Sequence, residues 1–350
     1  MRQDTNYAYA VGRIRVMEKS LLKNSDYDSL IDAADESFVT QLSGLGYGLS
    51  GKNAENEEAD VLRLLAESFP ARFTETVREV MKFAPEPDVL SIFLLPADYS
   101  NAKICVKSIA GMAEVSGEMP ELSTGGTLPR EMIWDAVRTG ERGKLDRGMF
   151  RAVTRATEEL SVSGNARKAD LLLDKACFVN MRELVGKACF FTRRFMDRYL
   201  DIYADWTNIL TAERIAFAGG SVELFKAAYL RGSIPAAQFI ANLNAGKRSY
   251  TDTPYAEYID GLSAGIGTLK PGTAGIEEQI DNVTLEKIAD VFTARFLAEN
   301  NSEPFRIDAL TAYLGALKLE TQNLRMITVG RRSGADKDTV RKLLRLTGRA

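Results

Sequence analysis

The stretch Tyr203–Gly220, "YADWTNILTAERIAFAGG", holds the pattern that decides the fold. Its apolar side chains recur at the spacing of an amphipathic helix, but Asp205 and Asn208 interrupt that spacing. Asn costs a helix interior roughly 0.6 kcal/mol relative to Ala, and Asp costs about as much. Helix propensity therefore does not account for either residue.

The same pattern, an acid followed three positions later by Asn, occurs three times in the chain. The three pairs are Asp98/Asn101, Asp205/Asn208 and Glu320/Asn323. Successive acids are 107 and 115 residues apart, and basic residues follow the pairs at matching offsets: Lys103 and Arg325 two positions after the Asn, and Lys107 and Arg214 six positions after it. This recurrence indicates an internal repeat.

A second motif repeats in phase with the first. "GGTLP" (125–129) and "RGSIP" (231–235) share the order Gly, hydroxyl, aliphatic, Pro, and their glycines Gly126 and Gly232 follow the Asn by about 25 residues. We do not find this motif after the third pair, and we attribute its absence to the end of the sequence at Ala350. Two motifs in phase predict three related units, with approximate boundaries at 1–125, 126–231 and 232–350.

Helical spacing dominates the rest of the chain, and almost no stretch alternates with a period of two. The predicted helices are 5–23, 27–43, 54–82, 88–110, 129–140, 146–160, 167–203, 204–218, 221–231, 255–264, 275–299, 304–329 and 336–347. The sequence therefore predicts an all-α fold. Three like units joined head to tail tend to close around an axis, so we expect three tandem helical domains forming a pseudo-threefold socket.

Composition limits the partners and the compartment. The 45 basic and 48 acidic side chains nearly balance, which argues against a nucleic-acid partner. The longest apolar run, "VLSIFLLPA", is far shorter than the roughly 20 residues of a membrane span, and charges occupy the N-terminus where a signal peptide needs an apolar core. We therefore expect a soluble, cytoplasmic protein. The three cysteines, Cys105, Cys177 and Cys189, have no C-x-x-C spacing, so we expect them to be buried thiols in a reducing compartment.

The chain contains no histidine, which excludes many catalytic sites. Ser-His-Asp and Cys-His catalysis and His-ligated metal sites are impossible without it. An enzyme that uses carboxylates alone, such as a metal-dependent hydrolase, would need acids on facing helices, whereas the repeated acids are spread one per unit. Few enzyme classes remain, and the carboxylate-only hydrolase stays open as an alternative; our expectation is no catalytic residue, no cofactor, no metal and no small-molecule substrate.

One glycine-rich loop resembles a nucleotide site. "GLGYGLSGKN" contains G-x-G-x-x-G at Gly46, Gly48 and Gly51, and residues 46–53 differ from a phosphate-binding loop only at Asn53, where Ser or Thr would bind magnesium. The segment before it has helical rather than strand spacing, and the following "AENEEAD" is acidic. We interpret it as a loop between two helices, without bound nucleotide.

The repeated pair allows two interpretations. The acid and the Asn are neighbours on one flank of a helix, where they could contact a partner protein. Alternatively, the Asn amide bridges a neighbouring helix and the acid pairs with a nearby Lys or Arg. Recurrence in every unit favours packing, because a functional centre is needed only once.

The C-terminal stretch 331–350 is the most basic part of the chain, with seven basic residues against Asp336 and Asp338. This excess is typical of a solvated helix face, and it would also suit acidic lipid or an acidic partner. Val340, Leu343 and Leu344 are expected to face the core in either case.

Four features together resemble one family. They are "NYAYAVGRIRVMEKSLL" (6–22), "FVTQLSGLGYG" (38–48), the three acid-x-x-Asn helices, and "LETQNLRMITVGRRSGADKDTVRKLL" (319–344). In this order they resemble the C subunit of bacterial and archaeal V/A-type rotary ATPases, the counterpart of the d subunit of eukaryotic V-ATPases. Matched by position, the N-terminal signature is Tyr7, Tyr9, Arg13, Arg15 and Glu18, and the C-terminal one is Glu320, Asn323 and Arg325. The first repeat departs from the others at Pro96, where its helix is expected to begin or kink.

The resemblance implies a funnel of three similar domains between the central rotor stalk and the membrane ring of proton- or sodium-carrying subunits. Such a protein would be peripheral to the membrane, would transmit torque during ATP-coupled ion transport, and would catalyse nothing. A helical-repeat scaffold for other protein partners is the alternative. It would share the triplication but not the N-terminal signature.

Overall fold

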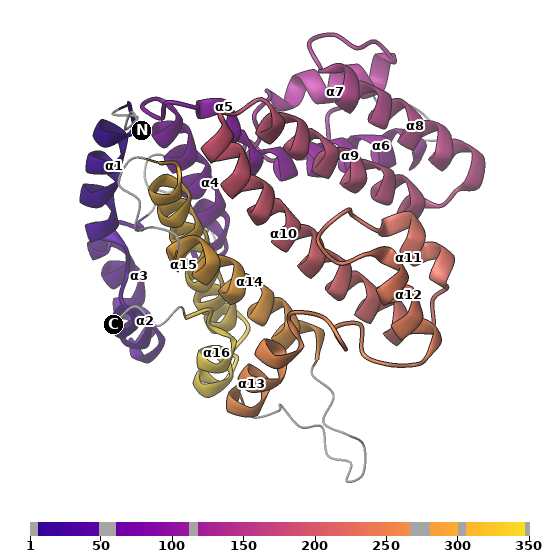
Figure 1. The fold of residues 1–350 in the computed structure, drawn as a ribbon. Helices are drawn as coiled ribbons and strands as arrows, with labels where there is room; N and C mark the ends of the chain where they lie inside the picture. Colours follow the sequence, from indigo (N-terminus) through magenta and orange to yellow (C-terminus); the bar gives the residue numbers. More distant parts are fainter. Residues whose placement is uncertain (1–5, 49–60, 112–117, 267–280, 300–305, 347–350) are drawn as a thin grey trace. The chain divides into compact units, whose positions relative to one another are not determined.

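The structure is a computed structural model that describes residues 6–48, 61–111, 118–266, 281–299 and 306–346 (Figure 1). Every regular element within these ranges is a helix, so the predicted all-α class is confirmed. The chain divides into two compact units, Met81–Thr251 and a second unit that combines Met1–Val80 with Asp252–Ala350. The division into three tandem domains and the funnel stay predictions.

The unit formed by the two ends of the chain is built on the long helix α15. Tyr7, Ala10, Val11 and Ile14 are the buried face of α1, which packs against α15. One apolar cluster joins residues from both ends of the sequence, such as Tyr27, Phe38, Leu65, Leu324 and Val340. The helices of this unit are α1 (Asn6–Met17), η1 (Glu18–Ser20), α2 (Asn24–Asp32), α3 (Asp35–Gly44), α4 (Val61–Met81), α13 (Ala256–Ile266), α14 (Asn282–Glu299), α15 (Asp308–Arg332) and α16 (Lys337–Leu343).

The central unit is built on α6 and α10. The Asp146 side chain accepts hydrogen bonds from the amides of Gly148 and Met149 in the first turn of α8, and the Asn165 side chain accepts one from Lys168 N at the start of α9. Gly164 ends α8 in the left-handed conformation at φ 65°, which lets α8 and α9 pack side by side. The helices of this unit are α5 (Pro87–Leu90), η3 (Ser91–Phe93), α6 (Leu95–Gly111), α7 (Arg130–Thr139), α8 (Arg147–Ser163), α9 (Ala166–Gly186), α10 (Phe190–Phe217), α11 (Val222–Ala228) and α12 (Ala236–Asn244).

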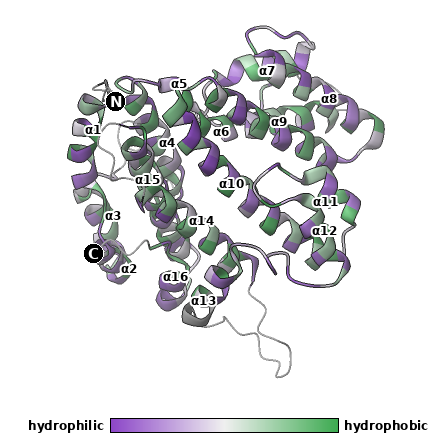
Figure 2. Cartoon of the chain, in the orientation of Figure 1, coloured by the Kyte–Doolittle hydropathy of each residue, from purple (hydrophilic) through white to green (hydrophobic). Residues whose placement is uncertain are grey.

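Most helices carry an apolar stripe on one side and polar residues on the other (Figure 2). Three helices are the exception: α6, α10 and α15 place acid and Asn residues among their buried apolar ones. All three are therefore core elements with polar groups inside, which need hydrogen-bond partners in the fold.

Several predicted helix boundaries were wrong. The range 27–43 is two helices separated at Ala33 and Ala34, and α12 was not predicted. The break predicted between 203 and 204 lies instead before Cys189, whose amide donates to Glu86 Oε1 at 2.7 Å. The expected helix start at Pro96 is confirmed, because α6 begins at Leu95, and Pro is compatible with a first helical turn that needs no amide donor.

The thiols divide into two groups. Cys105 and Cys177 are buried, as expected, and burial raises the pKa of each to about 12. Cys189 is exposed, so the expectation that all three are buried was wrong. Within the described ranges, no single helix is long and apolar enough to cross a membrane. Among the described helices, one pair, α5 with η3 followed by α6, has the length and composition of a membrane span, but the pair is bent by 50°.

Candidate functional site

The three acid–Asn pairs lie on the three helices α6, α10 and α15, and all six side chains are at most 3 % exposed. Burial of a carboxyl or amide without hydrogen bonds costs several kcal/mol, so each group needs partners inside the chain. We call each pair, together with the groups that it binds, a brace. The first brace is Asp98/Asn101, the second Asp205/Asn208 and the third Glu320/Asn323.

The three asparagines make the same pair of hydrogen bonds. Each Nδ2 donates to the carbonyl, and each Oδ1 accepts from the amide, of one residue that lies 22 positions later. The residue is Ser123 (2.8 and 2.9 Å) for Asn101, Leu230 (2.7 and 2.9 Å) for Asn208, and Arg345 (3.0 and 2.8 Å) for Asn323. Each Asn side-chain amide thus satisfies both the backbone N–H and the C=O of its partner residue, as a neighbouring strand would in a β-sheet. The partner is the backbone after the helix, not the neighbouring helix that we expected.

The aspartates of the first two braces bind the second sequence motif. Asp98 accepts from Thr127 N at 2.8 Å, Thr127 Oγ1 at 2.6 Å and Leu128 N at 3.2 Å. Asp205 accepts from the hydroxyl of Ser233 and from Ile234 N at 3.0 Å. These contacts explain why the two motifs repeat in phase: the acid of the first motif accepts hydrogen bonds from the residues of the second.

The glycine of the second motif is required by the closeness of the carboxylate. A Cβ atom on Gly126 would lie 1.8 Å from Asp98 Oδ1, and one on Gly232 would lie 2.2 Å from Asp205 Oδ1. Any larger residue would displace the acid. The other positions of the motif also have a role. The side-chain hydroxyl and the backbone amide of the aliphatic residue donate to the acid. Pro129 stands immediately before α7, and Pro235 immediately before α12.

The third brace is closed by the opposite end of the chain. Glu320 accepts from Leu22 N at 2.5 Å and from the hydroxyl of Tyr47, 298 and 273 residues away in sequence. Leu22 precedes α2 as Leu128 precedes α7, so the N-terminal segment supplies the donor that the third copy lacks. Burial raises the pKa of Glu320, and the hydrogen bonds from Tyr47 and Leu22 oppose the shift.

A small cavity of about 50 Å³ lies beside the third brace. Its lining includes Tyr27, Glu320, Asn323 and Arg345. This volume holds only a few water molecules, so the cavity is too small for a nucleotide or another cofactor.

The basic residues after each Asn have different environments. Lys103 pairs with Asp174 at 2.5 Å and Lys107 with Asp170 at 3.2 Å, both on α9. Arg325 is exposed on α15. Lys103, Lys107 and Arg325 therefore do not share one environment.

The N-terminal signature divides between packing and surface. Tyr7 is buried against α15, whereas Tyr9 is exposed with the Arg13 guanidinium 5.9 Å from its ring centre. Arg15 pairs with Glu18 at 2.8 Å. The signature thus contains one core residue and an exposed polar face.

The glycine loop is described only in part. The helix expected before it is α3, and Arg72 Nη1 donates to Gly46 O at 2.5 Å. Residues 49–53, with Gly51 and Asn53, lie outside the described ranges. No group of three potential metal ligands occurs among the described residues.

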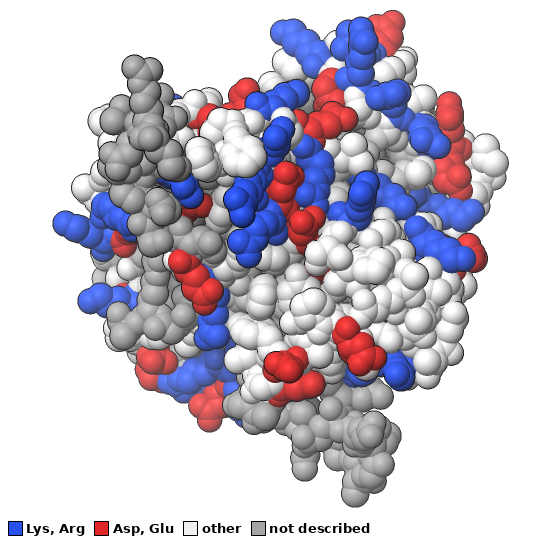
Figure 3. All heavy atoms as spheres, in the orientation of Figure 1, with Lys and Arg blue, Asp and Glu red and all other residues white. Residues whose placement is uncertain are grey.

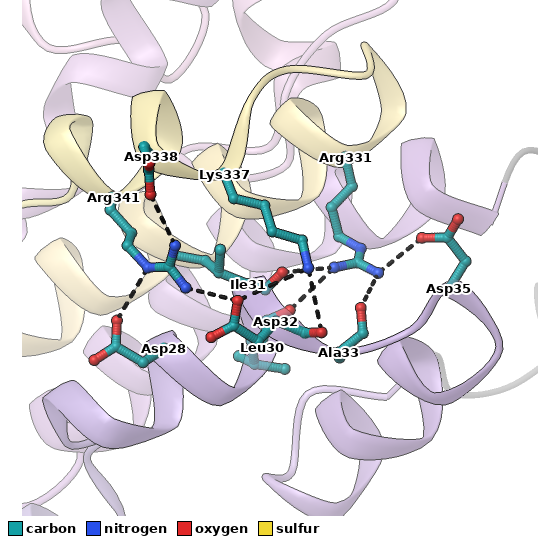
Figure 4. A network of polar contacts seen from close by, with 10 residues as sticks. All are labelled: Asp28, Leu30, Ile31, Asp32, Ala33, Asp35, Arg331, Lys337, Asp338 and Arg341. Atoms are coloured by element: carbon teal, nitrogen blue, oxygen red, sulfur yellow. Dashed lines mark hydrogen bonds and ion pairs between the residues drawn. The ribbon is translucent and has the colours of Figure 1, made fainter.

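The basic C-terminal stretch meets acidic residues inside the chain (Figure 4). Arg331 donates to the carbonyls of Leu30, Ile31 and Ala33, at 3.2, 3.2 and 2.7 Å, and pairs with Asp35 at 2.7 Å. Its guanidinium also lies 4.5 Å from the ring centre of Phe38.

A second group of ion pairs joins α16 to α2. Arg341 pairs with Asp32 at 2.6 Å and with Asp28 at 3.7 Å, and Lys337 lies 3.8 Å from Asp32. We call these contacts, with those of Arg331, the C-terminal clasp. Sequence reasoning missed it, because the acids that face α16 lie about 300 residues earlier. Val340 and Leu344 are buried, as expected, and Leu343 is half-buried.

Comparison with known proteins finds similarity over most of the chain. The model of a family described as the ATP synthase (C/AC39) subunit matches residues 10–343. The chain is 23% identical over 274 residues to the C subunit of the V-type sodium ATPase of Enterococcus hirae, covering 75% of this chain and 76% of that protein. It is 20% identical over 357 residues to the C subunit of the A-type ATP synthase of Haloferax volcanii, covering 96% of each chain.

Proposed function

Because the chain belongs to the ATP synthase (C/AC39) subunit family of V/A-type ATPases, we propose that it is the non-catalytic connector of such a complex. In this role it links the central rotor stalk to the membrane ring of ion-carrying subunits and transmits torque between them. Its location is then cytoplasmic and peripheral to the membrane. The ion carried by the ring is a proton or sodium.

The observation that carries this proposal is the threefold use of one buried brace. A part that transmits torque must resist deformation, and each brace fixes a helix to other segments of the chain through buried hydrogen bonds. The third brace and the C-terminal clasp also tie the two ends of the chain to each other. Such a frame has little local freedom at these points.

The same groups argue against catalysis. The three carboxylates are spread one per brace, and each already accepts hydrogen bonds from backbone or hydroxyl donors of the chain. An acid-base pair or a two-carboxylate metal site needs its acids on one cavity. With no histidine in the sequence, the chain lacks the commonest general base as well.

The proposal is tested by omission. Membranes that carry the ion-translocating ring are reconstituted with the catalytic head and the other subunits, with and without this chain. We expect ATP hydrolysis by the isolated head in both cases, and an ATP-driven ion gradient only when the chain is present. Full pumping without it would disprove the connector role, and loss of hydrolysis by the isolated head would indicate a catalytic or assembly role instead.

A second measurement tests the absence of a nucleotide site. We expect magnesium-ATP to leave the thermal midpoint of the purified chain unchanged, because Asn53 and the following acids oppose phosphate binding. A true ligand at a hundredfold its dissociation constant would stabilise the protein by roughly 2.7 kcal/mol. A clear shift with magnesium-ATP would contradict the interpretation of the glycine loop.

A further inference from the structure

We propose that the first turns of α10 form a docking surface for an acidic partner protein with an apolar centre. The surface consists of Phe190, Phe191, Arg193, Arg194 and the preceding Lys187, and we call it the Phe–Arg surface. The proposal rests on the proposed function, in which the chain is held by other subunits. All five residues belong to the central unit of the chain.

Two neighbouring phenylalanines are exposed at the start of α10. Phe190 is 60 % and Phe191 46 % exposed, and their rings meet edge to face at 5.5 Å between centres. The exposed part of each ring is apolar surface that a partner could remove from water. A pair of rings already packed on each other presents one apolar centre to a partner.

Basic side chains surround these rings. Lys187, Arg193 and Arg194 are exposed, and none of them forms an ion pair with a described residue. In the view of Figure 3, Lys and Arg side chains gather over the first turns of α10. The nearby acids Asp197 and Asp201 pair with Arg182, so they leave the surface with a positive excess.

Helix stability does not explain this charge. The positive end of the helix dipole lies at the N-terminus, so basic residues there are unfavourable for the helix. The helix start is instead stabilised by Glu86, which accepts from Cys189 N at 2.7 Å and from Thr192 Oγ1 at 2.5 Å. Arg193 and Arg194 therefore add a cost that an anionic partner would remove.

The surface is held in place before any partner arrives. Glu86 fixes the first turn of α10, and Arg182 ties α9 to α10 through Asp197 and Asp201. A surface that is already ordered loses less conformational entropy on binding.

Its composition favours a protein over a lipid surface. Arg and aromatic residues are enriched at the centres of protein interfaces, whereas lipid-binding clusters consist of four to eight basic residues beside a membrane segment. The Phe–Arg surface has two aromatic residues and three basic ones. The complementary partner is a protein surface with carboxylates around an apolar patch.

The test measures binding of the full chain to the purified central-stalk subunits of its own complex. The variants are Arg193→Glu/Arg194→Glu and Phe190→Ser/Phe191→Ser. The matched controls are Arg151→Glu/Arg155→Glu on the exposed side of α8 and Phe217→Ser at the end of α10, where Phe217 is also exposed. Affinities are measured by calorimetry at low and high salt, and circular dichroism checks that each variant is folded.

We expect each surface variant to bind about tenfold or more weakly, as interface hot spots do, with a reduced salt dependence for the charge reversal. The controls should bind like the wild type. Equal binding by folded surface variants would overturn the inference while leaving the connector role intact. Failure of the wild type to bind any stalk subunit would instead count against the proposed function.

A second measurement tests lipid as the partner. Binding of the wild type and the variants is compared on vesicles of phosphatidylcholine with and without phosphatidylglycerol. If the variants lose only vesicle binding, the surface binds lipid and the inference of a protein partner is wrong.

Discussion

The second and third braces use the same chemistry with different reach. In the second brace, Asp205 and Asn208 both bind a loop that lies 22 to 29 residues later. In the third, Asn323 binds the backbone 22 residues later, but Glu320 binds Leu22 and Tyr47 near the start of the chain. One brace is thus closed locally and the other joins the two ends of the sequence.

The difference in reach accounts for the difference in residues. Asp205 lies so close to its loop that only Gly232 fits there. Glu320 has one more methylene than Asp205, and the segment that it binds has Leu21 and Leu22, with full side chains, at the corresponding place. The second brace closes a short loop, whereas the third closes a loop of about 300 residues. Closing the longer loop costs more chain entropy. The third brace therefore needs further contacts between the chain ends, and the C-terminal clasp supplies them.

The largest expected effect is at the glycine of the second brace. Gly232→Ala places a Cβ atom 2.2 Å from Asp205 Oδ1 and 3.1 Å from Ala204 Cβ, so the carboxylate must move from its donors. A buried carboxylate without its partners costs roughly 3–5 kcal/mol, and we expect that loss in the free energy of unfolding. Urea denaturation followed by circular dichroism measures it.

Gly186→Ala is the matched control, because a Cβ atom there meets nothing within 4 Å. We expect it to change the free energy of unfolding by less than about 1 kcal/mol. Equal effects of the two substitutions would show that the close approach at Gly232 is not what selects glycine.

The next effect tests whether the three asparagines are equivalent. Asn101→Ala, Asn208→Ala and Asn323→Ala each leave one amide and one carbonyl without a partner, which costs about 1–3 kcal/mol. Hydrogen exchange should speed up at the amides of Ser123, Leu230 and Arg345, respectively. The exposed Asn244 on α12 provides the control Asn244→Ala. Unchanged stability with weakened binding to the stalk would favour a partner-contact role for that Asn.

Only part of the brace architecture could be predicted from the sequence. The all-α class and the phased motifs were readable because helix periodicity and residue order are local properties. The hydrogen-bond partners of the asparagines were not, since the amide could satisfy a helix or a loop equally well. Only the offset of 22 residues in all three braces, seen in the structure, identifies the partner.

Two features that the sequence did not predict have related physical causes. The break before Cys189 is fixed by Glu86, about 100 residues earlier, so no local pattern marks it. The basic C-terminal stretch was expected to be a solvated helix face, with acidic lipid or an acidic partner as the alternative, and its ion pairs with Asp28 and Asp32 of α2 and Asp35 of α3 were not predicted. Contacts between distant segments do not appear in the periodicity of either segment.

A smaller effect separates two parts of the C-terminal clasp. Arg331 is 12 % exposed and binds three carbonyls at the end of α2, so Arg331→Ala should cost about 1–2 kcal/mol through lost packing and helix-end contacts. Arg341 is more exposed, and its ion pairs with Asp28 and Asp32 should be worth less than about 1 kcal/mol. High salt should weaken only the Arg341 contribution strongly. An equal loss for both variants would contradict this division.

The smallest effect is a pH dependence that belongs to the third brace. Burial raises the pKa of Glu320 above its ordinary value of 4.5, so the folded chain holds this proton more tightly than the unfolded chain does. The contribution of Glu320 to the free energy of unfolding is therefore complete below pH 4.5 and is lost as the pH rises through the raised pKa, with a slope of at most about 1.4 kcal/mol per pH unit.

The variant Glu320→Gln tests this pH dependence, because its side chain cannot ionise but keeps an oxygen that can accept from Leu22 N and the Tyr47 hydroxyl. The difference in unfolding free energy between the wild type and Glu320→Gln should thus fall with rising pH in this window, while Glu183→Gln on the exposed side of α9 controls for the loss of one ionisable group. A difference that rises with pH would mean that the donors from Leu22 and Tyr47 outweigh burial, and that the junction between the chain ends is held by a carboxylate rather than by a carboxylic acid.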